Sequence, residues 1–237
     1  MERKIYRILW FTAFLLIEGG LFAVILIREA AGPDEIALRF LSVAVACFFA
    51  AELLIMRRGA ERLFLLLAMA FTVSADVFLV LLDRHYELAV GLFLIAQCLH
   101  AVRILLGGKR SVLPSVIARL ALSVSAVAAL VIFKFFAPLT VLGALYAAEL
   151  LMNVIDSALS VRSGKRFILS FIGFFLFLLC DVTVGLNGIG RGFGIPSGVL
   201  SALSDLTWVF YLPSQVLIVL SALDRTDESA ESPETES

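Results

Sequence analysis

The sequence predicts an all-α integral membrane protein, a bundle of about eight transmembrane helices. Its 237 residues are 61% hydrophobic and only 16% charged, whereas a soluble domain carries about 25% charged residues. The mean hydropathy is +1.03. The apolar residues also form blocks of about twenty, which is the length a helix needs to cross the hydrocarbon core. A soluble fold is therefore excluded.

Charged residues and Gly/Pro pairs divide the apolar blocks into single spans. The first block follows basic residues, as in a signal peptide, but it is longer than a signal core and lacks a small-residue cleavage site, so we expect it to be retained. Residues 1–223 are predicted to form one domain, and residues 224–237 an acidic, disordered cytoplasmic tail. The predicted spans are 8–27, 36–56, 63–82, 88–106, 114–133, 137–160, 167–186 and 199–223.

The distribution of basic residues predicts the orientation. With the N-terminus inside, fourteen of the nineteen Lys and Arg residues, including Arg103 and Arg119, fall on the inner side. Cytoplasmic loops carry such an excess of positive charge. Both termini are therefore predicted to be cytoplasmic, in a multi-pass protein of the cell membrane.

Several classes of site have no signal in the sequence. A net charge of −1 gives no reason to expect a nucleic-acid partner. Cys47, Cys98 and Cys180 lie inside apolar blocks and are interpreted as packing residues. No dinucleotide, P-loop or HExxH motif occurs, and a metal site built on His100 would lack recognisable ligand spacing. No cofactor and no metal are predicted.

Two intramembrane carboxylates carry most of the functional information. Asp76 lies 14 residues after Arg62, and Asp181 lies 15 residues after Arg166. At 1.5 Å per residue, both lie roughly 20 Å from the inner face. Charged groups at such depth usually face a bundle interior or cavity, so the two acids are predicted to face each other. The alternative is that each acid only forms polar contacts between helices.

Other polar residues lie near the same level. Gln97 and His100 are three residues apart and share one helix face. Asp156, near the inner end of its span, is expected to face the 162–166 loop. Ser74–Val77 and Leu179–Val182 lie four spans apart and suggest a 4+4 parallel repeat. Two spans carry polar stripes with helical spacing, namely Tyr146, Glu149, Asn153 and Asp156, and Asp205, Trp208, Tyr211 and Gln215.

Short motifs in five spans follow a recognisable order. They are Ala75-Asp76, then Gly91-Leu92-Phe93 with His100, then Leu145-Tyr146 with Met152 and Ala158, then Asp181 within 174–187, then Tyr211 and Gln215 within 208–220. In this order they resemble the YhhN family of lysoplasmalogenases. The chain departs from the family pattern at Ala75, where Gly is common, at Cys180, where Ser is common, and at Pro213.

The resemblance implies a reaction and a set of site residues. Known members of this family hydrolyse the vinyl-ether bond of lysoplasmalogens, which releases a fatty aldehyde and a glycerophospho-base. The implied substrate is a lysophospholipid within the membrane, and the implied catalytic residues are Asp76 and Asp181. The resemblance and the polar pattern together predict five substrate-binding or orienting residues, Gln97, His100, Tyr146, Tyr211 and Gln215.

Paired carboxylates suit this chemistry, but two other functions fit the sequence as well. In a water-poor pocket two carboxylates cannot easily both ionise, so one retains a proton and serves as the acid while its partner acts as the base. A proton-coupled transporter of small molecules or lipids would use the same acids and a repeat. The broken helices that are typical of such transporters are not indicated, because spans 63–82 and 167–186 contain no proline. In a non-catalytic lipid-binding or scaffold protein, the polar stripes would only hold the helices together.

Overall fold

The computed structural model describes residues 2–29, 36–56, 58–108 and 111–223, and these ranges contain helices and short turns without any strand. Eight helices in these ranges are long and apolar enough to cross a membrane. Two short segments, the π-helical η1 and the 3-10 helical η2, extend α3 and α6. The elements are α1 (Glu2–Glu29), α2 (Ile36–Met56), α3 (Ala60–Asp76), η1 (Val77–Leu81), α4 (Tyr86–Gly107), α5 (Val112–Ile132), α6 (Pro138–Ser160), η2 (Val161–Ser163), α7 (Lys165–Gly192) and α8 (Ser197–Leu220).

The predicted all-α membrane fold is confirmed, and each predicted span corresponds to one helix. The largest differences are at α1 and α7, which continue past the apolar blocks into polar residues. Hydropathy registers only the part of a helix that lies in hydrocarbon, whereas backbone hydrogen bonding continues into the interface. The predicted acidic tail, 224–237, lies outside the described residues.

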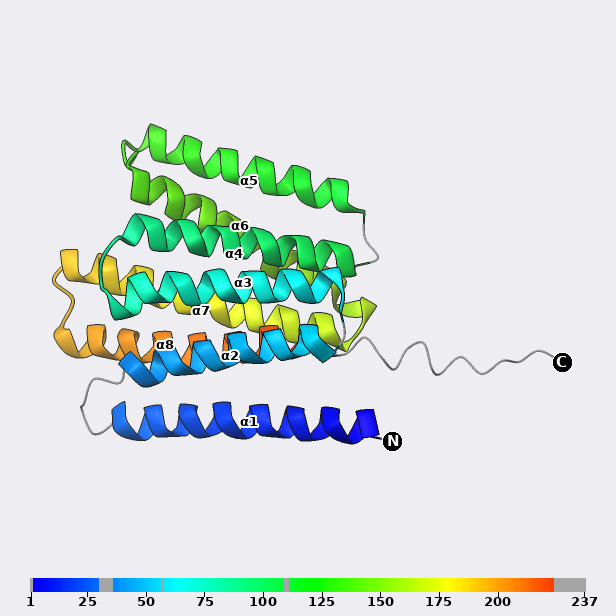
Figure 1. The fold of residues 1–237 in the computed structure, drawn as a ribbon. Coiled ribbons are helices and arrows are strands. Elements are labelled where there is room, and N and C mark those ends of the chain that lie inside the picture. The colour runs from blue at the N-terminus through cyan, green and yellow to red at the C-terminus, as the bar shows by residue number, and fades with distance from the viewer. Residues whose placement is uncertain (1, 30–35, 57, 109–110, 224–237) are drawn as a thin grey trace.

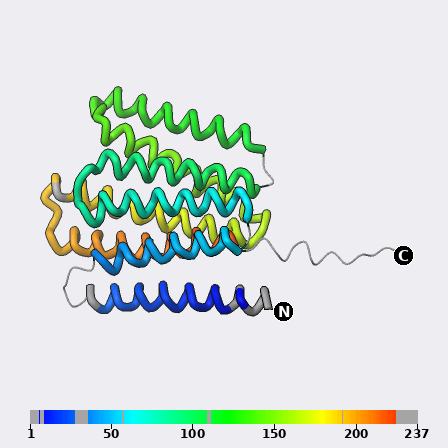
Figure 2. Tube along the Cα trace, viewed as in Figure 1, coloured from blue at the N-terminus to red at the C-terminus, as the bar shows by residue number. Residues whose placement is uncertain are grey.

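Of the eight long helices in the described ranges, six form a closed ring and two lie outside it. The contacts run from α2 to α3, α4, α6, α7 and α8, and α8 closes the ring against α2. Figure 1 shows the helices running side by side along one common direction. Figure 2 shows α1 and α5 at opposite edges of the bundle. Among the helices, α1 packs mainly on α2, and α5 packs on α6.

The packing repeats after four helices. Helix α1 rests on α2 as α5 rests on α6, and the α2–α3–α4 series matches the α6–α7–α8 series. The joints between the halves, α4 with α6 and α8 with α2, also correspond. The arrangement therefore agrees with a 4+4 parallel repeat, in which α3 and α7 lie opposite each other in the ring.

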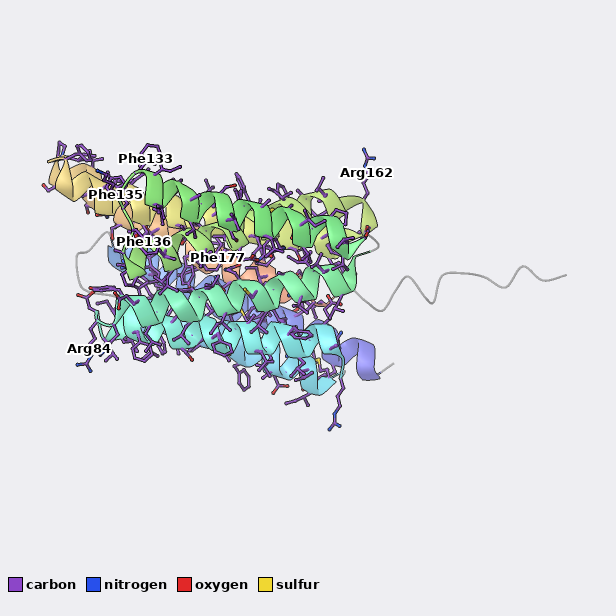
Figure 3. All side chains as sticks on the ribbon, turned by 90° about the horizontal axis from the view of Figure 1, so that it is seen from above. Arg84, Phe133, Phe135, Phe136, Arg162 and Phe177 are labelled. Atoms are coloured by element: carbon purple, nitrogen blue, oxygen red, sulfur yellow. The ribbon has the colours of Figure 1, made fainter. Side chains whose placement is uncertain are left out.

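The two ends of the bundle differ in the residues that they carry. Arg84 and the aromatic residues Phe133, Phe135 and Phe136 lie at one end, and Arg162 lies at the other (Figure 3). We call the end with Arg162, where α1 begins and α8 finishes, the inner end, following the predicted orientation. That orientation with cytoplasmic termini stays a prediction.

The assignment of Arg103 and Arg119 to the charged inner face is wrong. Both side chains are buried inside the bundle. The Arg103 guanidinium donates to the Ile218 carbonyl at 3.1 Å, to Ser170 Oγ at 3.2 Å and to Ser221 Oγ at 2.5 Å. These bonds tie α4 to α7 and α8, so Arg103 adds no charge to a loop. A count of basic residues cannot separate such an internal arginine from one in a loop.

Close packing of α7 on α8 depends on Gly173. A Cβ at this position would lie 2.9 Å from Ile218 Cγ1 and 3.2 Å from both Ile218 N and Ser214 O. We expect Gly173→Val to lower the free energy of unfolding by about 1–3 kcal/mol through overpacking. Gly185→Val is the matched control, because a Cβ on Gly185 of the same helix meets no atom within 4 Å. Thermal unfolding in detergent measures both, and equal losses would contradict this packing argument.

Candidate functional site

Asp76 ends α3 with its side chain inside the ring. It is 2% exposed, and Tyr211 Oη of α8 donates a hydrogen bond of 2.7 Å to its Oδ2. Helices α3 and α8 are not neighbours in the ring, so this bond crosses the interior. The bond therefore fixes the carboxylate in the middle of the bundle.

The π-helical segment η1 begins directly after Asp76. Its Val77 carbonyl accepts from the Leu82 amide at 2.9 Å, five residues on. Such wider turns are rare and often occur at functional sites, because they change the direction of the side chains around them. The helix continues through Leu81 without a break. The local geometry at Asp76 therefore differs from that of a regular helix.

Asp181 occupies the corresponding place on α7. Its side chain is half-buried, and Tyr146 Oη of α6 donates a hydrogen bond of 2.6 Å to its Oδ2. Both acids are thus bonded to a tyrosine from another helix through one oxygen. The two acids do not hydrogen-bond to each other.

The two acid–tyrosine pairs share one region of the interior. The ring of Phe93 lies 5.9 Å from Tyr146 and 6.2 Å from Phe177 between ring centroids. Phe177 in turn lies 5.3 Å from Tyr211 between ring centroids, so ring contacts connect the two tyrosines. Figure 3 shows Phe177 in the middle of the bundle. Four of the predicted residues, Asp76, Asp181, Tyr146 and Tyr211, therefore come together.

The other three predicted residues lie on the inner side of the carboxylates. Gln97 Oε1 accepts from Asn153 Nδ2 at 2.9 Å, His100 packs edge-on against Phe174 with ring centroids 5.1 Å apart, and Gln215 Nε2 donates to Ser214 Oγ at 3.2 Å. None of the three hydrogen-bonds to either aspartate. They face the same interior, but they lie closer to the inner end of the bundle than the carboxylates do.

The polar stripe of α6 serves two separate purposes. Tyr146 faces Asp181, whereas Glu149 and Asp156 form ion pairs with the buried Arg119 of α5. The Arg119–Asp156 contact is 2.7 Å. The expectation that Asp156 faces the 162–166 loop is therefore wrong, because its carboxylate is paired with an arginine on the neighbouring helix. Unpaired charges within a membrane are energetically unfavourable, so Arg119 forms ion pairs with the two nearby acids.

Asn153 connects this ion-pair cluster to the interior. Its Oδ1 accepts from Arg119 Nη2 at 2.9 Å, while its Nδ2 donates to Gln97 Oε1 at 2.9 Å and to the Gln97 carbonyl at 3.0 Å. The polar contacts thus run from α5 through α6 to α4. The stripe gave the face of Asn153 correctly but did not indicate either partner.

The α8 stripe is also divided. Tyr211 and Gln215 face the interior and are buried, but Asp205 is exposed. Trp208 lies 5.8 Å from Tyr211 between ring centroids, and the Arg39 guanidinium lies over its ring at 4.8 Å. Arg39 was not among the residues predicted for the site, whereas Cys180 was noted as the residue before Asp181 that departs from the family pattern. For Arg39 the only signal was a charge within an apolar block.

The described residues offer no ready metal site and one membrane-facing groove near α8. No group of three or more His, Cys, Asp or Glu side chains gathers in the described ranges. A groove of about 280 Å³ runs between α1 and α8, and Leu212, Pro213 and Val216 form part of its wall. These residues flank Tyr211 and Gln215, so one stretch of α8 faces the interior on one side and the groove on the other.

Comparison with known proteins supports one assignment. The model of the YhhN family matches residues 35–222, which include every ring helix and both acid–tyrosine pairs. No curated protein and no solved structure gives a significant match. The match leaves out all of α1, which also lies outside the ring. Because it extends over far more than half of the chain, the chain belongs to the YhhN family.

Proposed function

We propose that this protein is a membrane hydrolase that cleaves the vinyl-ether bond of lysoplasmalogens. Membership of the YhhN family supports this activity. The observation that carries the proposal is the arrangement of Asp76 and Asp181, each bonded to a tyrosine, around one interior region. A buried pair of carboxylates can divide the roles of acid and base.

The reaction needs one proton donor and one proton acceptor. The protonated aspartate transfers its proton to the β-carbon of the vinyl ether, which leaves an oxocarbenium ion. The ionised partner stabilises this cation. It then takes a proton from the water that adds to the α-carbon. The hemiacetal collapses to a fatty aldehyde and a free glycerol hydroxyl, so one water molecule is consumed for each bond cleaved.

The two tyrosines orient the carboxylates. Tyr211 and Tyr146 each occupy the Oδ2 atom of one aspartate, so the other carboxylate oxygen is available to the substrate. Phe93 and Phe177 lie beside the tyrosines, and such rings restrict access of bulk water. Electrostatic stabilisation by fixed groups is stronger in a site of this kind than in water.

A single-chain lipid in the cell membrane suits the shape of the protein. Its hydrocarbon chain enters from the side, between helices, and the apolar groove along α8 provides such a surface. Its headgroup stays towards an interface. We therefore propose a lysophospholipid within the membrane as the substrate.

The proposal is tested with protein purified in detergent. A choline lysoplasmalogen is added, and released aldehyde is measured as its hydrazone. The matched 1-alkyl lysophospholipid, which has the same chain and headgroup but no double bond, should give no product. Absence of aldehyde, together with substrate-dependent flux in proteoliposomes, would favour a transporter.

Removal of either tyrosine hydroxyl should slow the reaction and leave the fold intact. Tyr146→Phe and Tyr211→Phe each delete one hydrogen bond to a carboxylate, and bonds to charged groups are worth about 1.5–3 kcal/mol. We expect kcat to fall about 10-fold or more. Tyr86→Phe is the control, since Tyr86 Oη donates to Asp83 Oδ1 at 2.6 Å in an exposed outer turn. Wild-type kcat in both site variants would exclude an orienting role.

A further inference from the structure

Buried polar atoms without hydrogen-bond partners occur at several places among the described residues, and four of the side chains concerned lie on the inner side of the carboxylates. The atoms are Thr72 Oγ1, Gln97 Nε2, both ring nitrogens of His100 and Gln215 Oε1. Each of these side chains is at most 1% exposed. We call these four residues the interior polar cluster.

The interior polar cluster lies on the inner side of the carboxylates, on three ring helices. Thr72 is one helical turn inward of Asp76 on α3, and Gln215 is one turn inward of Tyr211 on α8. His100 is joined to α7 through its contact with Phe174, 5.1 Å between ring centroids. The cluster therefore begins one turn below the acid–tyrosine pairs.

A dry interior is energetically unfavourable at this place. A buried donor or acceptor that remains unpaired costs about 1–3 kcal/mol, and a cluster of such atoms multiplies that cost. Backbone or side-chain partners satisfy nearly all buried polar groups in folded proteins. Other such atoms occur elsewhere in the described residues, but these four side chains lie together on the inner side of the carboxylates.

The chemistry of the cluster matches water. Gln97 Nε2 only donates and Gln215 Oε1 only accepts, whereas Thr72 does both and neutral His100 offers one donor and one acceptor. A water molecule donates twice and accepts twice, and buried water usually makes about three such bonds. Metal ions are disfavoured by the amide nitrogen and by the lack of a carboxylate within the cluster.

We infer that the interior polar cluster binds water and supplies it to the carboxylate pair. The second part of this inference rests on the proposed hydrolase function, because that reaction consumes one water molecule at a place lined by aromatic rings. Water held one turn below Asp76 and Tyr211 reaches the α-carbon without opening the site to bulk solvent. Gln97, His100, Thr72 and Gln215 are then positioning residues, which act through water.

Radiolytic hydroxyl-radical labelling in ¹⁸O water tests the binding of water directly, without any substrate. Radicals formed from bound water modify the side chains beside it, so we expect label on His100 and Phe174 in the wild type. Phe14 is the control, because it is as fully buried as Phe174 but packs between the rings of Trp10 and Phe49. Label on Phe174 no higher than on Phe14 would overturn the inference.

The change in stability caused by Thr72→Val has opposite signs for a cluster that holds water and for one that does not. Replacing an unpaired hydroxyl with a methyl group stabilises a dry site. In a wet site the same change removes a partner of water, so stability does not rise, Phe174 label falls, and kcat decreases several-fold at unchanged KM. Thr183→Val is the matched control, since Thr183 Oγ1 already bonds Cys180 O at 2.6 Å and Thr207 Oγ1 at 2.8 Å. It should leave Phe174 label unchanged.

The two readouts distinguish failure of this inference from failure of the proposed function. Strong label on Phe174 without aldehyde release would support the water site and contradict the proposed hydrolase function. Aldehyde release together with an unlabelled Phe174, or with a Thr72→Val protein that is clearly more stable than the wild type, would support the hydrolase function and contradict the water site.

Discussion

Asp76→Asn and Asp181→Asn should each lower the rate of aldehyde release by at least about 10²-fold, and as much as 10⁴-fold, the range that general acid–base groups contribute. An amide neither delivers a proton to carbon nor takes one from water. Its carbonyl oxygen still accepts the tyrosine hydrogen bond seen at each aspartate. Folding should therefore be retained while the chemistry is lost. The measurement is single-turnover aldehyde release with enzyme in excess.

Asp205→Asn is the matched control for both variants. Asp205 lies on α8 but is exposed, so the same change there should leave the rate near that of the wild type. Retention of a third or more of the wild-type rate by either site variant would exclude that aspartate from the proton transfers. The double variant should be no slower than the worse single variant, because residues that act as one unit are not additive.

Arg119→Met should strongly destabilise the protein. Arg119 is the shared partner of Glu149 and Asp156, and its removal leaves one buried and one half-buried carboxylate without a charge partner. Breaking a buried ion pair by removing one partner costs about 3–5 kcal/mol. Because α5 packs mainly on α6, the lost ion pairs weaken the packing of α5 on the rest of the bundle. Thermal unfolding in detergent should show the decrease.

Charge removal on both sides should restore most of this stability. In the triple variant Arg119→Met with Glu149→Gln and Asp156→Asn, no buried charge is left without a partner, and apolar or neutral replacements of buried ion pairs are often well tolerated. A triple variant as unstable as Arg119→Met alone would show that packing, rather than charge pairing, makes Arg119 important.

The spans could be predicted from sequence because the bilayer imposes one length and one composition on all of them. Blocks of apolar residues between polar turns gave eight spans, and eight helices correspond to them. Depth was predictable for the same reason, since a fixed rise per residue places Asp76 and Asp181 at one level. The rotation of each helix was predictable where a stripe of polar residues marks its inner face, as at Tyr146 and Tyr211.

The partners of those residues were not predictable. A stripe indicates which face is inside, but not which helix lies across from it, so neither the Tyr211–Asp76 bond nor the Tyr146–Asp181 bond followed from the sequence. The π-helical turn after Asp76 contains no glycine or proline from which it could have been predicted. Arg119 was misplaced because charge counting treats every arginine near a helix end as part of a loop, whereas its guanidinium points back into the bundle.

The repeat of the helix packing has a consequence for how the two acids differ. Equivalent positions in the two halves, α3 and α7, hold chemically identical groups in unlike surroundings: one is sealed and next to a widened turn, the other is half-buried on a regular helix. Symmetry thus supplies a matched pair, and local divergence makes its members unequal. In the proposed reaction, the two aspartates therefore serve as proton donor and proton acceptor without a second kind of residue.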